Sequence, residues 1–405
     1  MMNRTTAFYL GLLLSASPMY YIPSTYSQEI PKDISQKMKP ATVKILLHEN
    51  QKQVILEAKG KYQVCNPLNN YVLFNGSFSK RAPLIHEQAG IKWGELIPGT
   101  FQIRIIPLDS DTTIFVNGMQ YRGCVEVYDD NGMITVVNEV DVESYLRSTL
   151  TPQFKHEMNQ EVLNAIAIVA RTNTYHMLSK QQQFQLYHVN AEEVGYVGHG
   201  ATLQNTMLEA AISSTRHAIM TLNNKPFAAT WHQNSAGKTA DFASVFRINT
   251  PSPEGVSIPI TESDRQKLGW SFTASKEQIA HIAGLMKVSN LSLFSEPKSG
   301  KVYAVRVSNG DKTHNIDFFT LQKALGDHRL KSNDSTLDIK GKSIMFTGYG
   351  QGHGTGLCLY SAALMAKHGQ DAAKMLGTFF PHTKLQKVRS LETSTTTTSS
   401  NRDLQ

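Results

Sequence analysis

Residues 348–356 alternate glycine with other residues and read Gly348-Tyr349-Gly350-Gln351-Gly352-His353-Gly354-Thr355-Gly356. We call this segment the glycine run. Inside regular structure a glycine costs roughly 0.5–1 kcal/mol relative to alanine, so this density predicts backbone turns or surfaces that admit no side chain. Such a segment is able to lie very close to a ligand. Dinucleotide-binding and Walker loops need G-x-G-x-x-G and G-x-x-x-x-G-K-[ST], so the strict G-x-G-x-G spacing argues against phosphate binding.

The first 27 residues have the layout of a secretory signal. One charge, Arg4, is followed by an apolar stretch over residues 7–14 and by small and polar residues before Gln28. That stretch is too short to span a bilayer comfortably, and no later stretch approaches the roughly 20 apolar residues of a transmembrane helix. We therefore expect export, to a secreted or periplasmic location, with the segment either cleaved near Ser27 or retained as a membrane anchor. Residues 28–40 are expected to be a linker.

The charge balance is modestly basic. Without residues 1–27 the formal net charge falls from +7 to +6, because Arg4 is the only ionised side chain among them. This excess suits an anionic extracytoplasmic polymer or a membrane surface, and generic surface charge explains it equally well. It is far from the dense basic stripe of a nucleic-acid-binding protein.

Cysteine usage excludes a disulfide framework. The chain has three cysteines, Cys65, Cys124 and Cys358, and none lies in a C-x-x-C arrangement. One bridge between Cys65 and Cys124 and buried free thiols both fit the sequence.

A β-rich N-terminal subdomain is predicted over residues 41–135. Two dipeptides, Asn117-Gly118 and Asn131-Gly132, are strong hairpin signals because a type I′ turn demands positive φ at both central positions. Apolar strand patterns accompany them at residues 43–48, 54–58, 101–107, 113–116, 124–128 and 134–137.

Helical patterns follow these strands, so the predicted fold class is α+β with a few helices. Asp141 is placed to cap a short helix through Leu150, and apolar residues recur at helical spacing over residues 159–178. Further helical turns are expected over residues 360–369 and 371–380. Strand patterns return after Leu222, and the tail 389–405 is too poor in apolar surface to fold.

Three segments, in order and at plausible spacing, resemble one family. The first contains residues 136–138 (VVN), 145–147 (YLR) and 161–172 (EVLNAIAIVART), similar to the pattern VN…YLxGV…EALKAQAVAART. The second, residues 228–239 (AATWHQNSAGKT), resembles A-x-Y-x-S-x-S-x-G-G-x-T and is called the Ser235 loop below. The third is the glycine run, which is similar to GxGWGHGxGMSQ. These are signatures of the SpoIID/LytB family (stage II sporulation protein D, amidase enhancer), and the resemblance covers about residues 110–388.

The resemblance implies a SpoIID-like core over residues 136–388 that acts on bacterial peptidoglycan in cell division or septal wall turnover. Such a protein is a lytic transglycosylase that cleaves glycan strands, or an enhancer of the N-acetylmuramoyl-L-alanine amidase that strips their stem peptides. The alternatives are a catalytically inactive glycan-binding module that recruits the amidase, and a β-rich extracytoplasmic interaction protein that keeps only the fold. No cofactor is implied.

The resemblance also locates a candidate catalytic acid. The family uses the glutamate of a Glu-Met pair eight residues after the tyrosine, a position that ungapped counting from Tyr145 assigns to Gln153. An amide cannot carry a proton to a glycosidic oxygen, and Glu157-Met158 matches only after a four-residue shift. If Pro152 begins a helix, Glu157 presents its carboxylate one turn from Gln153. Glu157 is then either the catalytic acid or a plain exposed carboxylate.

Substrate-binding residues are expected in one groove lined by His232, His353 and Tyr349. In the Ser235 loop, Ser235, Lys238 and Thr239 either donate hydrogen bonds to sugar groups or form a simple turn. His353 alone is equally well explained as a ring bonded to backbone in a tight turn. No four-ligand metal set is visible, and Gln160 breaks the H-E-x-x-H pattern that would begin at His156. Arg171 is expected to be a structural ion-pair partner.

Overall fold

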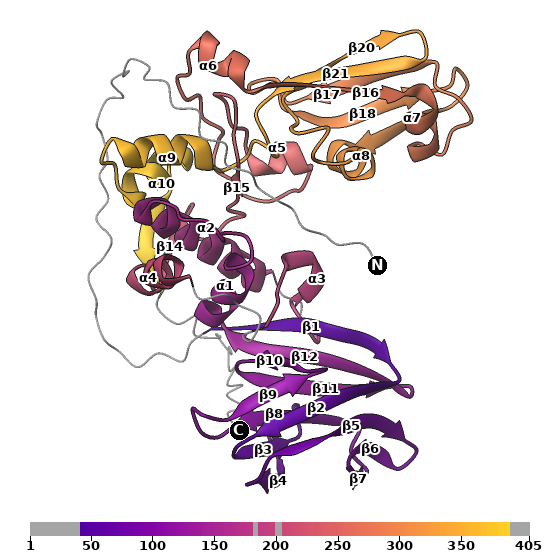
Figure 1. Ribbon diagram of the computed structural model, residues 1–405, viewed down its shortest axis with the longest axis vertical. Coiled ribbons are helices and arrows are strands. Elements are labelled where there is room, and N and C mark those ends of the chain that lie inside the picture. The colour runs from indigo at the N-terminus through magenta and orange to yellow at the C-terminus, as the bar shows by residue number, and fades with distance from the viewer. Residues whose placement is uncertain (1–40, 181–184, 199–204, 389–405) are drawn as a thin grey trace, which may run out of the picture.

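The computed structural model describes residues 41–180, 185–198 and 205–388. The expected secretory segment (1–27), linker (28–40) and tail (389–405) lie outside the described residues. Helices and strands are mixed, which confirms the α+β class. Figure 1 shows two β-sheets at one end, a group of helices in the middle and a separate β-rich lobe at the other end. Within the described residues, no helix is long and apolar enough to cross a membrane.

Two β-sheets pack face to face in the N-terminal part. The seven-stranded sheet has the order β13 (Val189–Asn190), β1 (Thr42–Gln51), β12 (Met133–Asp141), β11 (Cys124–Asp130), β8 (Gln102–Pro107), β3 (Tyr62–Cys65) and β4 (Val72–Gly76). The six-stranded sheet has the order β10 (Met119–Tyr121), β9 (Thr113–Val116), β2 (Gln53–Lys59), β5 (Lys80–Glu87), β6 (Gly90–Trp93) and β7 (Glu95–Pro98).

Alternating side chains from both sheets build the core between them. Val54 and Leu56 of β2 and Ile103 and Ile105 of β8 are buried in one cluster, as the period of two in a strand requires. The predicted strands therefore exist, whereas the strand patterns between residues 62 and 98 were missed. Both hairpin turns are confirmed, because Asn117 and Asn131 have φ of 49° and 51° and each is followed by a glycine with positive φ.

Five helices form the middle of the molecule. They are α1 (Val142–Leu150), α2 (Gln160–Ser179), α4 (Thr206–Ser214), α9 (Leu359–Lys367) and α10 (Ala372–Phe379). The short helix α3 (Ala191–Val194) follows β13, and the two-stranded sheet of β14 (Ala218–Thr221) and β23 (Lys384–Lys387) lies against α2. Asp141 and Asn159 cap α1 and α2 through their side chains, as Ser144 and Glu161 amides donate to them. The predicted helices are confirmed to within two residues.

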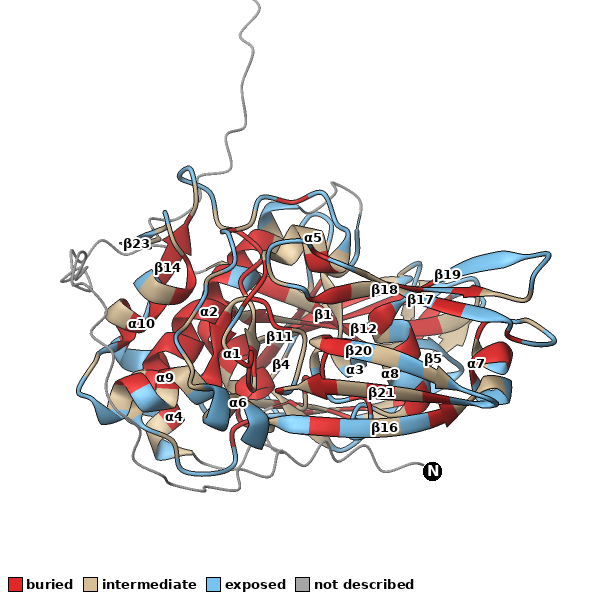
Figure 2. Ribbon diagram, turned by 90° about the horizontal axis from the view of Figure 1, so that it is seen from above, coloured by how far each residue is buried: buried red, intermediate tan, exposed pale blue. Residues whose placement is uncertain are grey.

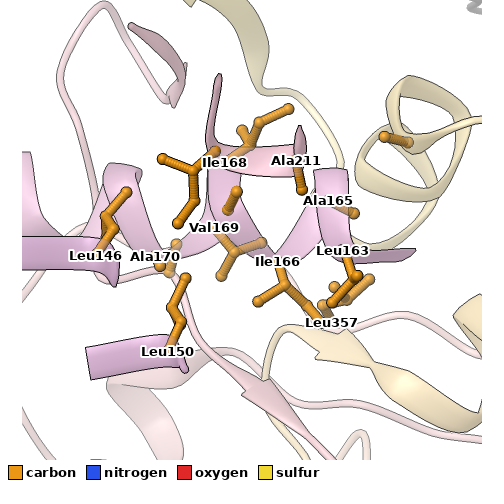
Figure 3. Close-up of a cluster of buried hydrophobic side chains, with 14 of the residues drawn as sticks. Leu146, Leu150, Leu163, Ala165, Ile166, Ile168, Val169, Ala170, Ala211 and Leu357 are labelled. Carbon is orange, nitrogen blue, oxygen red and sulfur yellow. The ribbon is translucent and has the colours of Figure 1, made fainter. Parts of the chain in front are cut away.

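Helix α2 is the centre of this helical core. Residues 162–172 of α2 are all buried (red in Figure 2), so the helix is covered on every side rather than along one stripe. Figure 3 shows Leu146 and Leu150 of α1, Ala211 of α4 and Leu357 packed around it. Three alanines, Ala165, Ala167 and Ala170, allow the neighbouring elements to approach closely.

A buried ion pair joins the elements around α2. The fully buried Arg171 donates to both carboxylate oxygens of Glu143, at 3.0 and 2.7 Å. The same guanidinium donates to the carbonyls of Thr215 (2.9 Å), Ala218 (3.2 Å) and Ile212 (3.2 Å). One side chain therefore ties α2 to α1, α4 and β14. This confirms the expected structural role of Arg171.

Residues 262–349 form a lobe with a hydrophobic core of its own. We call it the insertion lobe, because it separates the Ser235 loop from the glycine run in the sequence. Its sheets have the orders β16 (Gly269–Ser275), β21 (Ser343–Tyr349), β20 (Ser335–Lys340) and β17 (Asn290–Ser295), β18 (Val302–Ser308), β19 (Thr313–Asp317). Its helices are α6 (Glu262–Lys267), α7 (Lys276–Ile282) and α8 (Phe318–Leu325).

The Arg171–Glu143 pair gives a stability prediction. Arg171→Met is expected to lower the free energy of unfolding by about 3–5 kcal/mol, because it leaves the Glu143 carboxylate buried without its partner. Arg147→Met is the matched control, since the Arg147–Glu209 pair is partly exposed and is worth less than about 1 kcal/mol. Urea unfolding of both variants tests this. Equal losses for the two would contradict the assigned role.

Candidate functional site

The glycine run lies between the Ser235 loop and the insertion lobe. Gln351 and Asn234 exchange two backbone hydrogen bonds of 2.9 Å, and the Ala240 amide donates to the Gly354 carbonyl at 2.8 Å. On the other side the Gly352 amide donates to the Lys331 carbonyl at 2.9 Å. The short strands β15 (Trp231–His232) and β22 (Leu357–Cys358) continue the contact as a parallel pair. The second and third family-like segments are thus adjacent in space.

Close approach of the chain to itself explains the glycines. Gly350 has φ of 74°, and a Cβ there would lie 2.4 Å from the Asn234 carbonyl oxygen. Gly354 has φ of 67°, and a Cβ would lie 2.7 Å from Cε of Lys301. Both the conformation and the space therefore require glycine. The predicted surfaces without side chains exist, and here they face other parts of the protein.

His232 and His353 come together, as the sequence predicted. Their ring centroids are 5.6 Å apart with the planes at 60°. Nδ1 of His232 lies 2.9 Å from the Thr355 carbonyl and therefore donates to it. Nδ1 of His353 accepts the Thr355 amide at 3.2 Å and lies 2.8 Å from the Thr355 hydroxyl. These bonds assign the tautomers, and they leave Nε2 of His232 without a partner among the described residues.

Both imidazoles are held in the neutral form. Burial lowers the pKa of His232 to about 3, and the Lys301 ammonium acts in the same direction, against the Thr355 carbonyl. Burial, followed by the neighbouring His232 ring, also lowers the pKa of His353. At neutral pH the pair therefore offers neutral donors and acceptors rather than cations.

The remaining predicted residues of the Ser235 loop have different environments. Ser235 is buried, its amide donates to Sγ of Cys358 at 3.4 Å, and its hydroxyl has no partner among the described residues. Thr239 is also buried, and its hydroxyl accepts the Val256 amide at 2.8 Å, a bond within the loop structure. Lys238 is exposed, and its backbone forms an isolated bridge with Ser257. Of the three, Ser235 lies closest to the chemistry of the histidine pair.

Lys301 belongs to this site and was not predicted from the sequence. It is 1% exposed, and its ammonium donates to the Ser235 carbonyl at 2.8 Å and to the Asp334 carboxylate at 3.0 Å. Burial lowers the pKa of Lys301, and Asp334 opposes that shift. The lysine is part of the insertion lobe, so it ties that lobe to the Ser235 loop. The sequence indicates Lys301 only indirectly, because some side chain has to fill the space that the glycine at position 354 leaves open.

Several polar atoms near Lys301 have no protein partner. Nε2 of His232, Oγ of Ser235 and both side-chain polar atoms of Asn333 are buried without a hydrogen bond among the described residues. Oδ1 of Asn333 would lie 3.4 Å from a Cβ at Gly354, so it lines the same region as Lys301. Buried polar atoms of this kind are normally satisfied by water or by polar groups of a ligand.

Half-exposed aromatic rings border the histidine pair. The ring of Phe246, in α5 (Phe242–Phe246), lies 5.5 Å from His353 and 5.0 Å from Phe319 of α8. On another side Trp231 lies 6.0 Å from Phe154. Tyr349 does not join them, because the Arg265 guanidinium of α6 covers its ring at 4.3 Å and Gln266 donates to its hydroxyl at 3.4 Å.

The condition under which Glu157 would lie one helical turn from Gln153, a helix beginning at Pro152, is not met. Pro152 lies in the turn that follows α1, where the Gln153 and Phe154 amides both donate to the Leu150 carbonyl, and no new helix begins there. The next helix begins only after its cap at Asn159, so Glu157 is an exposed carboxylate in an irregular segment. Gln153 is also exposed, and its amide donates to the Thr149 carbonyl at 2.9 Å.

The described residues form neither a disulfide bond nor a group of three metal-ligating side chains. Cys65, Cys124 and Cys358 are all free thiols, so the alternative of a bridge between the first two is not realised. Within residues 41–180, 185–198 and 205–388, no three histidine, cysteine or carboxylate side chains are grouped to hold a metal ion. The two histidines lack a third ligand of that kind.

A family model and several relatives match this chain. Residues 130–222 match the model of SpoIID, stage II sporulation protein. An uncharacterized protein of Chlamydia pneumoniae is 35% identical over 180 residues, 44% of this chain and 65% of the relative, so the chain spans less than two thirds of that relative's length. An uncharacterized protein of Brachyspira hyodysenteriae is 24% identical over 84% of this chain and 91% of its own. Stage II sporulation protein D of Bacillus subtilis is 25% identical over 62% of this chain and 76% of its own.

The neutral histidine pair predicts a pH dependence of stability. The folded pKa of His232, about 3, lies below the unfolded value of about 6.5, so below pH 6.5 only the unfolded chain takes up this proton. Stability is therefore present above pH 6.5 and is lost as the pH falls, at up to about 1.4 kcal/mol per pH unit for this ring. His232→Asn should reduce that slope between pH 6 and 4 in urea unfolding. An unchanged slope would show that His232 is protonated in the folded protein.

Proposed function

This chain belongs to the SpoIID family, and from that premise we propose that it binds the glycan strands of bacterial peptidoglycan and supports their remodelling. Membership of this family suggests a cell-wall-related role in sporulation. The function that the geometry supports best is a glycan-binding module that works beside an N-acetylmuramoyl-L-alanine amidase.

One observation carries the proposal: the Ser235 loop and the glycine run meet at two neutral imidazoles. Polar atoms of His232 and Ser235 that have no partner among the described residues lie there, and the ring of Phe246 lies 5.5 Å from His353. Neutral hydrogen-bonding groups beside aromatic faces are what a sugar requires, because its hydroxyl and acetamido groups are polar while its ring faces are apolar. A site for phosphate would instead concentrate cations.

The position of the carboxylates favours binding over cleavage. A general acid works best in a partly apolar setting, and Glu157 is an exposed carboxylate in an irregular segment. Gln153 occupies the counted position of the family's acid and has no proton to donate. The chain would therefore hold a strand while an amidase removes the stem peptides.

Lytic transglycosylase activity is the second candidate. The contact between Phe154 and Trp231 supports it, because it brings the turn that contains Gln153 next to the Ser235 loop. In that reaction the Glu157 carboxylic acid would protonate the leaving glycosidic oxygen. The carboxylate would then accept the proton of the sugar's 6-hydroxyl as that oxygen attacks the anomeric carbon, which yields an anhydro product.

The proposed function also requires that the protein be exported from the cytoplasm. Action on peptidoglycan requires a secreted or periplasmic protein, and the secretory layout of residues 1–27 supports this location, with or without retention as an anchor.

Digestion of glycan strands separates the two candidates. The wild-type chain, Glu157→Gln and Gln153→Glu are incubated with peptide-stripped strands, and mass spectrometry counts anhydromuramyl ends. The binding module predicts no ends from wild type. New ends from Gln153→Glu alone would identify the position where a carboxylate is productive, whereas ends from wild type that Glu157→Gln abolishes would establish the transglycosylase.

Binding itself is tested at His353. His353→Ala is expected to weaken co-sedimentation with peptidoglycan sacculi about tenfold, because the ring that contacts both His232 and Phe246 is lost from the site. The control is His328→Ala, which removes an exposed histidine of the insertion lobe. Far-ultraviolet circular dichroism should be unchanged in both variants. Loss of helicity in His353→Ala would instead assign that residue a structural role.

A further inference from the structure

Two arginines and two aromatic rings form a row that begins at Arg247, at the end of α5, and continues across the insertion lobe. The rings of Phe294 in β17 and Tyr303 in β18 are stacked with centroids 6.2 Å apart and planes at 20°. The Arg306 guanidinium lies 4.5 Å over Phe294, and the Arg247 guanidinium lies 4.9 Å over Tyr303. We call these four residues the arginine–aromatic row. Both rings are half-buried and both arginines are exposed.

The row lies on the polar outer face of a sheet whose inner face is core. Val305 and Val307 of β18 are fully buried, and Arg306 between them points the other way. Arg306 pairs with Ser292 of β17 on one side and with Asn315 of β19 on the other. Oδ1 of Asn315 accepts from Nε of Arg306 at 3.2 Å, which fixes the guanidinium and leaves its terminal groups available.

The two positive charges of the row are not neutralised. Within the described parts of the chain, no carboxylate lies within ion-pair distance of Arg247 or Arg306. The insertion lobe as a whole has 13 lysines and arginines against nine aspartates and glutamates. Stacked, uncompensated guanidinium groups are suited to a ligand that carries carboxylates.

The row is continuous with the histidine site. Arg247 directly follows Phe246, whose ring contacts His353 at 5.5 Å. Arg247 itself adopts φ of 55°, and its amide donates to the Ala243 carbonyl, so the end of α5 is held in a defined geometry. A chain-like ligand that leaves the histidine pair over Phe246 would reach Tyr303 and Phe294 next.

We propose that the arginine–aromatic row is an accessory binding face for a glycan strand whose alternate sugars carry a carboxylate. The rings stack on sugar faces, and the two guanidinium groups bind the carboxylates. This inference rests on the proposed function, and it adds a second contact region on a different lobe. The occupant is an extended acidic strand, because a short neutral sugar would use the rings and leave both charges unpaired.

Titrations of the full chain with two polymers test the face. Peptide-stripped muramyl glycan is the acidic strand, and an N-acetylglucosamine hexamer is the neutral one. Arg247→Gln with Arg306→Gln is expected to weaken acidic-strand binding about tenfold and to leave hexamer binding unchanged. Phe294→Ala should weaken both about fivefold. Arg329→Gln is the matched control, since Arg329 covers Phe272 at 6.0 Å elsewhere on the same lobe.

The outcomes separate this inference from the proposed function. Wild-type binding that the row variants do not change overturns the accessory face alone, provided that His353→Ala still weakens it. No wild-type binding to either polymer overturns both. An equal effect of Arg329→Gln would show that the weaker binding follows from the lower net charge of the lobe. Full competition by a polyglutamate peptide would show that the row is a binding surface for acidic peptides instead. Either of these last two results also rejects the face as a glycan site.

Discussion

The arrangement of the helical core depends on one buried charge pair. Arg171 and Glu143 are removed from water, which is costly unless every donor and acceptor is used. The guanidinium meets that condition by bonding the carboxylate and three carbonyls at the end of α4 and at the start of β14. In this placement all three nitrogens of the guanidinium donate hydrogen bonds. Hydrophobic packing around α2 supplies most of the stabilisation, and the pair selects among the packings that would otherwise be similar in energy.

A second buried charge, the Lys301 ammonium, fixes the insertion lobe against the Ser235 loop. Lys301 reaches from the insertion lobe to the Ser235 carbonyl and is paired with Asp334. The glycine run passes over its aliphatic stem, and the histidine pair lies at the next turns of the same backbone. The geometry of the candidate site is therefore set by three segments far apart in the sequence. Backbone hydrogen bonds join the glycine run both to the Ser235 loop, at Asn234, and to the insertion lobe, at Lys331.

The elements that were predicted correctly are mainly those that depend on residues close together in the sequence. The Asn-Gly turns, the caps at Asp141 and Asn159 and the apolar repeat of α2 are readable because each depends on a few neighbouring residues. A helix beginning at Pro152 was one possibility for Glu157, and α2 begins instead after the cap at Asn159. The strands between residues 62 and 98 were missed although β3–β4, β5–β6 and β6–β7 are local hairpins. The role of Lys301 depends on contacts between residues distant in the sequence. A single chain shows no pattern for such contacts. The resemblance found the Ser235 loop and the glycine run, but not the lobe that joins them.

The contact of Gly354 with Lys301 links two positions that are 53 residues apart in the chain. Any side chain at position 354 would occupy the volume of the lysine stem. Any shorter residue at position 301 would leave that volume empty beside the Asn333 side chain, which has no hydrogen bond among the described residues. Related chains are therefore expected to vary these positions only in concert. Because Gly354 has φ of 67°, a larger residue there would need a different backbone conformation as well as a smaller residue at position 301, at the expense of the cation under the Ser235 carbonyl. Relatives in which positions 354 and 301 have changed together would be those whose insertion lobe contacts the Ser235 loop through groups other than a buried lysine.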